Sequence, residues 1–170
     1  TESSWTLLGD ELVGTAFNGT TTYASSNRSW NQRFATAWGN GDLASSLVYS
    51  YRNGHELENH GSLGANPSDA ESHAVIWKTV FRNGGWTFEP TVDYFRSDSM
   101  TDLDSIEVDS LVGRTFDATN DSERERLRLS LDFEYEPNSP GWFADRVTGK
   151  LYFQSSTSDN LNRQGLLTPD

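Results

Sequence analysis

The fold class is indicated by the segment Arg126-Leu127-Arg128-Leu129-Ser130-Leu131-Asp132-Phe133-Glu134-Tyr135, in which polar and apolar residues alternate without a break. Successive side chains of an extended chain point to opposite sides, so the apolar residues share one side and the charged residues share the other. The segment therefore predicts a β-strand, with Leu127, Leu129, Leu131 and Phe133 on the face opposite Arg128 and Asp132.

The same two-residue period recurs along the chain, and no stretch has the three-and-four spacing of an amphipathic helix. Turn sequences rich in Gly, Asn and Ser separate the alternating segments, for example Asn83-Gly84-Gly85. We therefore predict an all-β antiparallel up-and-down meander in a single domain, 1–170, with 1–10 and 156–170 as loop ends. The predicted strands lie near 12–24, 29–38, 42–53, 72–82, 86–96, 122–136 and 143–155.

The connections between these strands differ in length by side. Antiparallel strands alternate in direction, so the short turns at 39–42, 83–85 and 138–141 fall at one end of the sheet. The turn at 25–28 and two long polar connections, 54–71 and 97–120, fall at the other end. Short turns on one rim and long loops on the other are typical of outer-membrane β-barrels.

Composition excludes several classes of protein. The chain has 170 residues, with 13 Lys+Arg against 25 Asp+Glu, so its formal net charge is −12. This acidity argues against a nucleic-acid partner, and the lack of Cys excludes disulfides and thiol nucleophiles. The longest apolar run, 74–77, is too short for a membrane-spanning helix, and the first residues lack the pattern of a signal peptide.

Two architectures fit the alternation. Aromatic rings near both strand ends, with aliphatic residues between them, match the girdles of a transmembrane β-barrel. The alternative is a soluble up-and-down barrel or sandwich that binds a ligand or a protein partner. One set of side chains distinguishes the two architectures, because it would face lipid in the transmembrane barrel and be buried in the soluble one: Leu47, Trp77, Phe88, Val92, Leu127, Leu129 and Leu131.

Several motifs resemble one family. The sequence Arg52-Asn53-Gly54-His55-Glu56-Leu57-Glu58-Asn59, after a Tyr-rich segment, is similar to the early barrel of TonB-dependent outer-membrane receptors of the haem, haemoglobin and transferrin type. Asn66-Pro67 fits the loop that follows. Tyr94-Phe95-Arg96-Ser97-Asp98 before Thr101-Asp102-Leu103 fits as well, as does Ser122-Glu123-Arg124-Glu125-Arg126 before 129–135. The resemblance spans about 11–155.

The resemblance implies part of a receptor barrel in the bacterial outer membrane that takes up an iron source, with haem expected. Its partners would be outer-membrane lipid, haem or an iron-carrying protein, and TonB, which would contact regions not found in this sequence. The plug and the TonB box of the family are not recognisable here. Seven strands cannot close a barrel and lipid does not tolerate an open edge, so we expect a piece of a larger barrel. The alternative to a piece of a larger barrel is an independent eight-stranded barrel in which 1–10 or 156–165 forms the last strand.

The candidate ligand contacts are His55, Glu56 and His60, which share a long connection. Neutral imidazole is a common metal or haem ligand, but a solvated polar loop explains the same residues, and no metal site is predicted because their spacing matches no ligand set. His73 is expected to have a structural role. The carboxylates of a second group could bind Ca²⁺ or could simply form an acidic, solvated loop: Asp98, Asp102, Asp104, Glu107 and Asp109.

No enzyme activity is predicted. Glu89 and Asp93 share a face, but their spacing along a strand places them about 13 Å apart, too far for a paired-carboxylate hydrolase. No nucleotide-binding loop or catalytic triad is recognisable. The alternating acids and arginines of 121–128 are interpreted as a charge ladder between strands. No resident cofactor is expected, and haem should bind the chain alone weakly or not at all, because an axial ligand needs an apolar slot beside it.

Overall fold

The computed structural model describes residues 13–55, 68–102, 115–137 and 145–167. Its elements are β1 (Val13–Ala24), a 3-10 turn η2 (Ser25–Asn27), β2 (Ser29–Asn40), β3 (Leu43–His55), β4 (Ser68–Asn83), β5 (Trp86–Asp102), β6 (Thr115–Tyr135) and β7 (Val147–Leu167). In these ranges no helix is long and apolar enough to cross a membrane.

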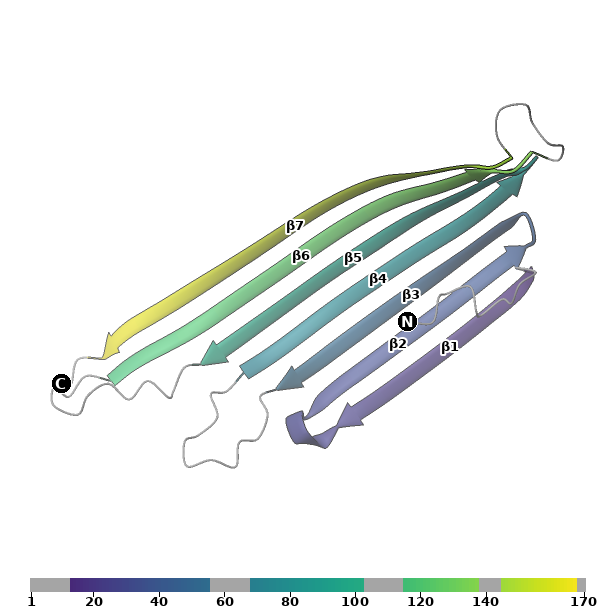
Figure 1. Ribbon diagram of the computed structural model, residues 1–170. Helices are drawn as coiled ribbons and strands as arrows, with labels where there is room; N and C mark the ends of the chain where they lie inside the picture. The colour runs from purple at the N-terminus through teal and green to yellow at the C-terminus, as the bar shows by residue number, and fades with distance from the viewer. Residues whose placement is uncertain (1–12, 56–67, 103–114, 138–144, 168–170) are drawn as a thin grey trace.

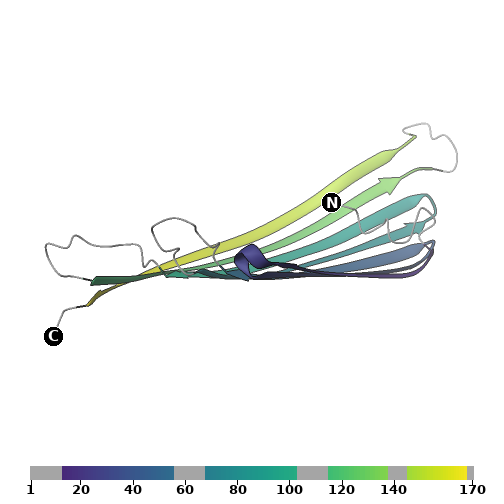
Figure 2. The ribbon, with the colours of Figure 1, turned by 90° about the horizontal axis from the view of Figure 1, so that it is seen from below.

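The strands form one antiparallel sheet in the order β1-β2-β3-β4-β5-β6-β7 (Figure 1). Each strand pairs with its neighbour in sequence, which confirms the predicted all-β up-and-down meander. Viewed from below, the described strands make a single curved layer (Figure 2). Within the described residues the sheet is not closed, because β1 pairs only with β2 and β7 pairs only with β6.

Tight turns join the strands at one end of the sheet (Figure 1). Gly84 and Gly85 connect β4 to β5 with φ angles of 57° and 86°. Positive φ at both central residues matches the right-handed twist of a two-stranded ribbon, and glycine adopts it without a steric cost. Between β2 and β3, Gly41 has a φ of 98°, and the backbone N–H of Leu43 donates a 2.9 Å hydrogen bond to Asn40 Oδ1. We call this the turn end and the opposite end the loop end.

The strands reach farther toward the loop end than the sequence pattern predicts. β3 runs through His55 and β4 begins at Ser68, although 54–71 were expected as a connection. β5 continues to Asp102 and β6 begins at Thr115, so much of the expected 97–120 connection is strand. β7 continues to Leu167, so 156–167 are strand and not a loop end. These stretches lack alternation, and backbone pairing between adjacent strands extends them without it.

The register assigns every described strand residue to one of two faces, because directly paired residues point to the same side. The apolar face carries Leu129 with its partners Val92 and Phe153; the polar face carries Arg128 with its partners Asp93 and Gln154. All the large hydrophobic side chains that are exposed lie on the apolar face, except Ile76 and Tyr152. The buried hydrophobic residues are small and lie on the polar face of β2, β3 and β4: Ala35, Ala37, Ala44, Val48 and Val80.

Candidate functional site

The apolar face holds an uncharged band near the turn end. On β5 this band runs from Trp86 to Tyr94, and on β6 it runs from Leu127 to Tyr135. Rings lie at its turn-end border, where the centroids of Trp86 and Tyr135 are 4.6 Å apart. The seven residues that the sequence places together on one face, with Leu129 among them, all lie on this face. Every charged side chain that the described strands place on the apolar face lies on the loop side of the band.

The band crosses the sheet obliquely. On β2 the corresponding stretch runs from Trp30 to Trp38 and is centred on Phe34. Through successive partners on β3 and β4, Phe34 lies in the same cross-strand row as Tyr94, which is the loop-side limit of the band on β5. The centre of the band is therefore four residues, about 14 Å, closer to the loop end on β2 than on β5. Three strand spacings of about 4.8 Å separate these strands, so between β2 and β5 the band is inclined by about 40° to the cross-strand rows. Between β5 and β6 it is level, because Trp86 pairs with Tyr135 and Tyr94 pairs with Leu127.

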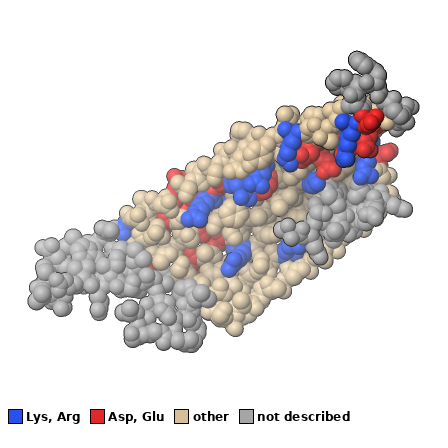
Figure 3. All heavy atoms as spheres, viewed as in Figure 1, with Lys and Arg blue, Asp and Glu red and all other residues tan. Residues whose placement is uncertain are grey.

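The polar face carries ion pairs between adjacent strands. Charged side chains gather along it on the side of the sheet that Figures 1 and 3 present. Lys78 Nζ lies 2.8 Å from Glu89, and Lys150 Nζ lies 2.9 Å from Asp132. Asp93, with 16% of its side chain exposed, lies 3.3 Å from Arg126 and 3.8 Å from Arg128. The carboxylates of the rejected hydrolase pair, Glu89 and Asp93, thus each have their own cationic partner.

The acidic and basic residues of 121–128 make ion pairs with neighbouring strands, as the interpreted charge ladder requires, but these pairs are divided between the two faces of the sheet. Alternation along β6 places Asp121, Glu123 and Glu125 on the apolar face and the intervening arginines on the polar face. On the polar face, Arg126 and Arg128 contact the carboxylate of Asp93 on β5, whereas Arg124 makes no ion pair with a described residue. Residues adjacent in sequence are on opposite sides of the sheet, so their charges compensate partners on neighbouring strands.

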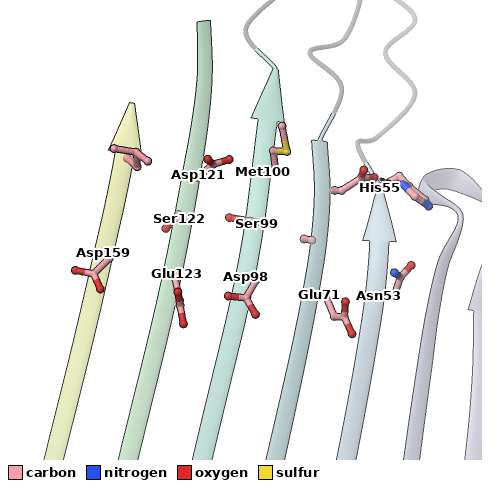
Figure 4. A pocket seen from close by; sticks show the side chains of 13 residues that line it. Asn53, His55, Glu71, Asp98, Ser99, Met100, Asp121, Ser122, Glu123 and Asp159 are labelled. Atoms are coloured by element: carbon pink, nitrogen blue, oxygen red, sulfur yellow. Dashed lines mark hydrogen bonds and ion pairs between the residues drawn. The ribbon is translucent and has the colours of Figure 1, made fainter. Parts of the chain in front are cut away.

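Beyond the apolar band, the apolar face becomes acidic at the loop end. One cross-strand row contains Asn53, Glu71, Asp98, Glu123 and Asp159, one residue from each of β3 to β7. Figure 4 shows these side chains lining a shallow hollow of about 690 Å³. We call the four carboxylates the acidic row. No sequence spacing indicates it, because its members come from four strands and only the register brings them together.

One cation compensates the centre of the acidic row. Arg96 Nε donates a 3.1 Å hydrogen bond to Asp98 Oδ2, and its Nη2 lies 2.9 Å from Glu123. The hydrogen bond and charge of Asp98, together with the charge of Glu123, raise the pKa of Arg96. Without such a cation, like charges directly opposite one another on neighbouring strands would be destabilising. Arg96 therefore holds β5 and β6 together at this level of the sheet.

The structure separates the three candidate ligand contacts. His55 is the last residue of β3, and its Nδ1 contacts the carboxylate of Asp69 on β4. Its side chain lies at the edge of the acidic hollow (Figure 4). Glu56 and His60 fall outside the described residues. His73 lies within β4, where its Nδ1 is 2.9 Å from the hydroxyl of Tyr49 and its Nε2 is 3.0 Å from Glu71, in keeping with a structural role.

The expected calcium ligands are also divided. Asp98 and Asp102 lie on β5, not in a connection, and Asp104, Glu107 and Asp109 fall outside the described residues. In the described part of the chain no group of three His, Asp or Glu side chains has the geometry to hold a metal ion.

Comparison with known proteins does not assign the chain to a family. No protein-family model matches the chain, and no curated protein matches it significantly. The class that the structure defines is a two-faced antiparallel up-and-down sheet with an oblique apolar band on one face and charged side chains on the other.

Proposed function

We propose that this chain is part of a transmembrane β-barrel in a bacterial outer membrane, with its apolar face toward lipid and its polar face toward the lumen. The observation that carries the proposal is the uncharged, oblique band on the apolar face. Large exposed rings, such as Trp77 at 47% and Phe17 at 74% exposure, need an apolar environment, and the hydrocarbon of a bilayer supplies it.

The dimensions of the band agree with this environment. The nine residues from Trp86 to Tyr94 span about 27 Å along the strand. With a strand tilt of about 40°, this corresponds to about 21 Å along the membrane normal, close to the ~25 Å apolar band of outer-membrane barrels. The inclination of about 40° between β2 and β5 lies within the ~35–45° tilt of strands in such barrels. A band inclined by the strand tilt would be level in a membrane.

The polar face suits a water-filled lumen. Its mid-strand charges, such as Asp93 and Lys78, have cross-strand partners but remain partly exposed, and an aqueous interior solvates what the partners leave unsatisfied. In the same orientation the turn end would be periplasmic and the loop end extracellular, because periplasmic turns are the short ones. The acidic row would then lie outside the membrane.

The finer proposal is a TonB-dependent receptor for an iron source, with haem as the expected cargo. It rests on the resemblance of the motifs at 52–59, 94–103 and 122–135 to that family. The open edges of β1 and β7 support a larger barrel, because unpaired backbone groups at a sheet edge are costly in lipid. Further strands, a plug and TonB contact would be supplied by other parts of the receptor.

The membrane placement can be tested by measuring the depth of two tryptophans. We would prepare variants of the complete barrel that retain only Trp77 or only Trp86, with every other tryptophan replaced by Phe, and fold each into phosphatidylcholine vesicles brominated at defined acyl positions. Trp77 lies inside the band and should be quenched most by deep bromines. Trp86 lies at its turn-end border and should be quenched most by shallow bromines.

The control for this test is the same measurement in unbrominated vesicles, with far-ultraviolet circular dichroism to show that both variants keep their strands. Equal quenching of both tryptophans at every depth would contradict the proposed orientation. A monomeric, folded chain in buffer without detergent or lipid would contradict the membrane proposal and favour a soluble ligand-binding sheet.

A further inference from the structure

The polar face is charged differently in its two halves. Near the turn end, cations and carboxylates alternate across strands, as in the pairs Lys78–Glu89 and Lys150–Asp132. Near the loop end, arginines outnumber carboxylates. The described strands place there Arg33, Arg52, Arg124, Arg126 and Arg128, with Asp93 as the acidic side chain that shares this half of the face.

These arginines, Arg33, Arg52, Arg124, Arg126 and Arg128, form what we call the arginine face. Arg33, Arg52 and Arg124 are exposed, and none of the three makes an ion pair with another described residue. Arg126 and Arg128 share the single carboxylate of Asp93. In addition, Arg126 Nε is buried and has no hydrogen-bond acceptor among the described residues. The arginine face thus has more positive charge and more N–H donors than its own residues satisfy.

The register places in one row two of the arginines that have no ion-pair partner among the described residues. Arg52 on β3 pairs with Ser72 on β4, which pairs with Ser97 on β5, which pairs with Arg124 on β6. Three strand spacings separate the two arginine backbones, about 14 Å. The two serines between them carry short side chains with hydroxyl donors, so long arginine side chains can lean over them from both sides. A shallow hollow beside Arg52 is lined by small residues, including Gly54, Ala70 and these serines, and also by Asn27, His55, Ser68 and Glu71.

The opposite side of the same strands has the opposite charge. The acidic row lies on the apolar face at nearly the same level as Arg52 and Arg124. At the loop end most carboxylates therefore lie on the apolar face and most guanidinium groups on the polar face, with Arg96 and Arg163 as apolar-face exceptions and Asp93 as the polar-face exception. The chain as a whole has a net charge of −12. An anion approaching the loop end would be repelled from the outer side and attracted to the polar face.

We propose that the arginine face binds a small solute that carries two or more oxyanion groups, such as carboxylates or phosphates. Guanidinium groups form bidentate, charge-assisted hydrogen bonds with such oxygens, and the intervening serines supply neutral donors. The hollow beside Arg52 has a volume of about 290 Å³, which is room for a small solute. This inference deepens the proposed function, and it rests on that function for the identification of the polar face with the lumen; the binding itself requires only the sheet.

The test measures binding of inorganic pyrophosphate to the full chain, folded in a zwitterionic detergent, by titration calorimetry at low ionic strength. A chelator is present so that a metal ion cannot bridge pyrophosphate to the acidic row. The double variant Arg52→Gln/Arg124→Gln should raise the dissociation constant at least tenfold. Arg52→Lys/Arg124→Lys keeps the charge but loses the bidentate geometry, so it should show a smaller increase.

The matched control is Lys78→Gln/Lys150→Gln, which removes the same charge from the turn-end half of the same face. We expect it to change the dissociation constant less than twofold, with circular dichroism showing that each variant retains its strands. Equal weakening in both double variants would overturn the proposal, because it would show a net-charge effect. Absence of saturable binding to the unmodified chain would overturn it too. If pyrophosphate binds saturably but the brominated lipids do not quench Trp77 and Trp86 at different depths, the membrane proposal is refuted. The proposal that the arginine face binds oxyanions would still hold.

Discussion

Leu129 shows how one residue reports the environment of a whole face. It lies on the apolar face of β6, where its partners are Val92 and Phe153, and it is 39% exposed. Its neighbour in sequence, Ser130, lies on the polar face between Thr91 and Tyr152. The two positions have nearly the same height in the sheet and differ in which side they face.

We predict that Leu129→Arg destabilises the lipid-embedded protein by about 2–4 kcal/mol, because an arginine near the bilayer midplane must leave water. Ser130→Arg is the control. It should cost less than about 1 kcal/mol, since a lumen-facing cation stays hydrated. Both values come from reversible urea unfolding in vesicles followed by tryptophan fluorescence. Equal costs for the two substitutions would argue against a lipid-facing surface at Leu129.

At the scale of elements, the β4–β5 hairpin sets the register of the sheet's centre. Its two-residue turn pairs Asn83 with Trp86, and the backbone N–H of Glu136 donates a 2.9 Å hydrogen bond to the carbonyl of Gly85. The turn therefore also contacts the chain that leaves β6. The pairing of β4 with β5 is interrupted between Lys78–Thr91 and Phe81–Phe88. Pro90 lies in this gap and has no backbone N–H to donate. The turn must therefore keep the two strands in register although some of their hydrogen bonds are missing.

We predict that Gly85→Ala destabilises the protein by at least about 1 kcal/mol. Gly85 has a φ of 86°, and a Cβ there would lie 2.4 Å from the carbonyl oxygen of Glu136. A left-handed conformation costs an L-residue about 1–2 kcal/mol, and the atom that the Cβ would meet is a backbone oxygen, not the far end of a flexible side chain. The measurement is reversible urea unfolding, as for Leu129.

The control for the hairpin is Gly84→Asn. Gly84 has a φ of 57°, and no other atom lies within 4 Å of the position that a Cβ would occupy there. Asn tolerates that backbone conformation, so its cost should stay within about 0.5 kcal/mol in the same unfolding measurement. A Gly85→Ala protein as stable as the Gly84→Asn protein would show that the turn does not determine the register.

At the scale of the whole molecule, the loop end places the candidate haem ligand at the edge of a shallow, open hollow whose lining mixes carboxylates with Ala70, Met100 and Leu161. His55 contacts Asp69, and the hollow beside it is lined by Glu71, Asp98 and Glu123. Carboxylates repel the propionates of haem and offer no apolar surface to its ring. His55 also lies on the apolar-face side of the sheet, opposite the proposed lumen.

We therefore predict that the 170-residue chain binds haem weakly or not at all. A titration followed by the Soret band should show no tight stoichiometric complex, and His55→Ala should leave the titration unchanged. Asp69→Asn, which removes the carboxylate that contacts the imidazole, is the companion variant and should also leave it unchanged. Tight binding that is lost in His55→Ala would make His55 a genuine axial ligand.

Local sequence pattern was sufficient to predict the strands, their order and their two faces. Alternation in 126–135 and 86–94 marks each face locally, because side chains on a strand alternate whatever lies beside it. Glycine turns such as Gly84-Gly85 mark where the chain reverses, since few residues adopt positive φ at low cost. Each of these signals depends on neighbouring residues in the chain, so a single sequence contains it in full.

The strand ends and the charge clusters emerged from the pairing of strands. At 97–102 and 156–167 the sequence does not alternate, and only pairing with an adjacent long strand makes these residues extended. The acidic row combines residues from four strands and the arginine face combines residues from three, so their existence depends on the register. Register is a property of strand pairs, set by turns and by the complementary faces of two segments, and no single segment encodes it.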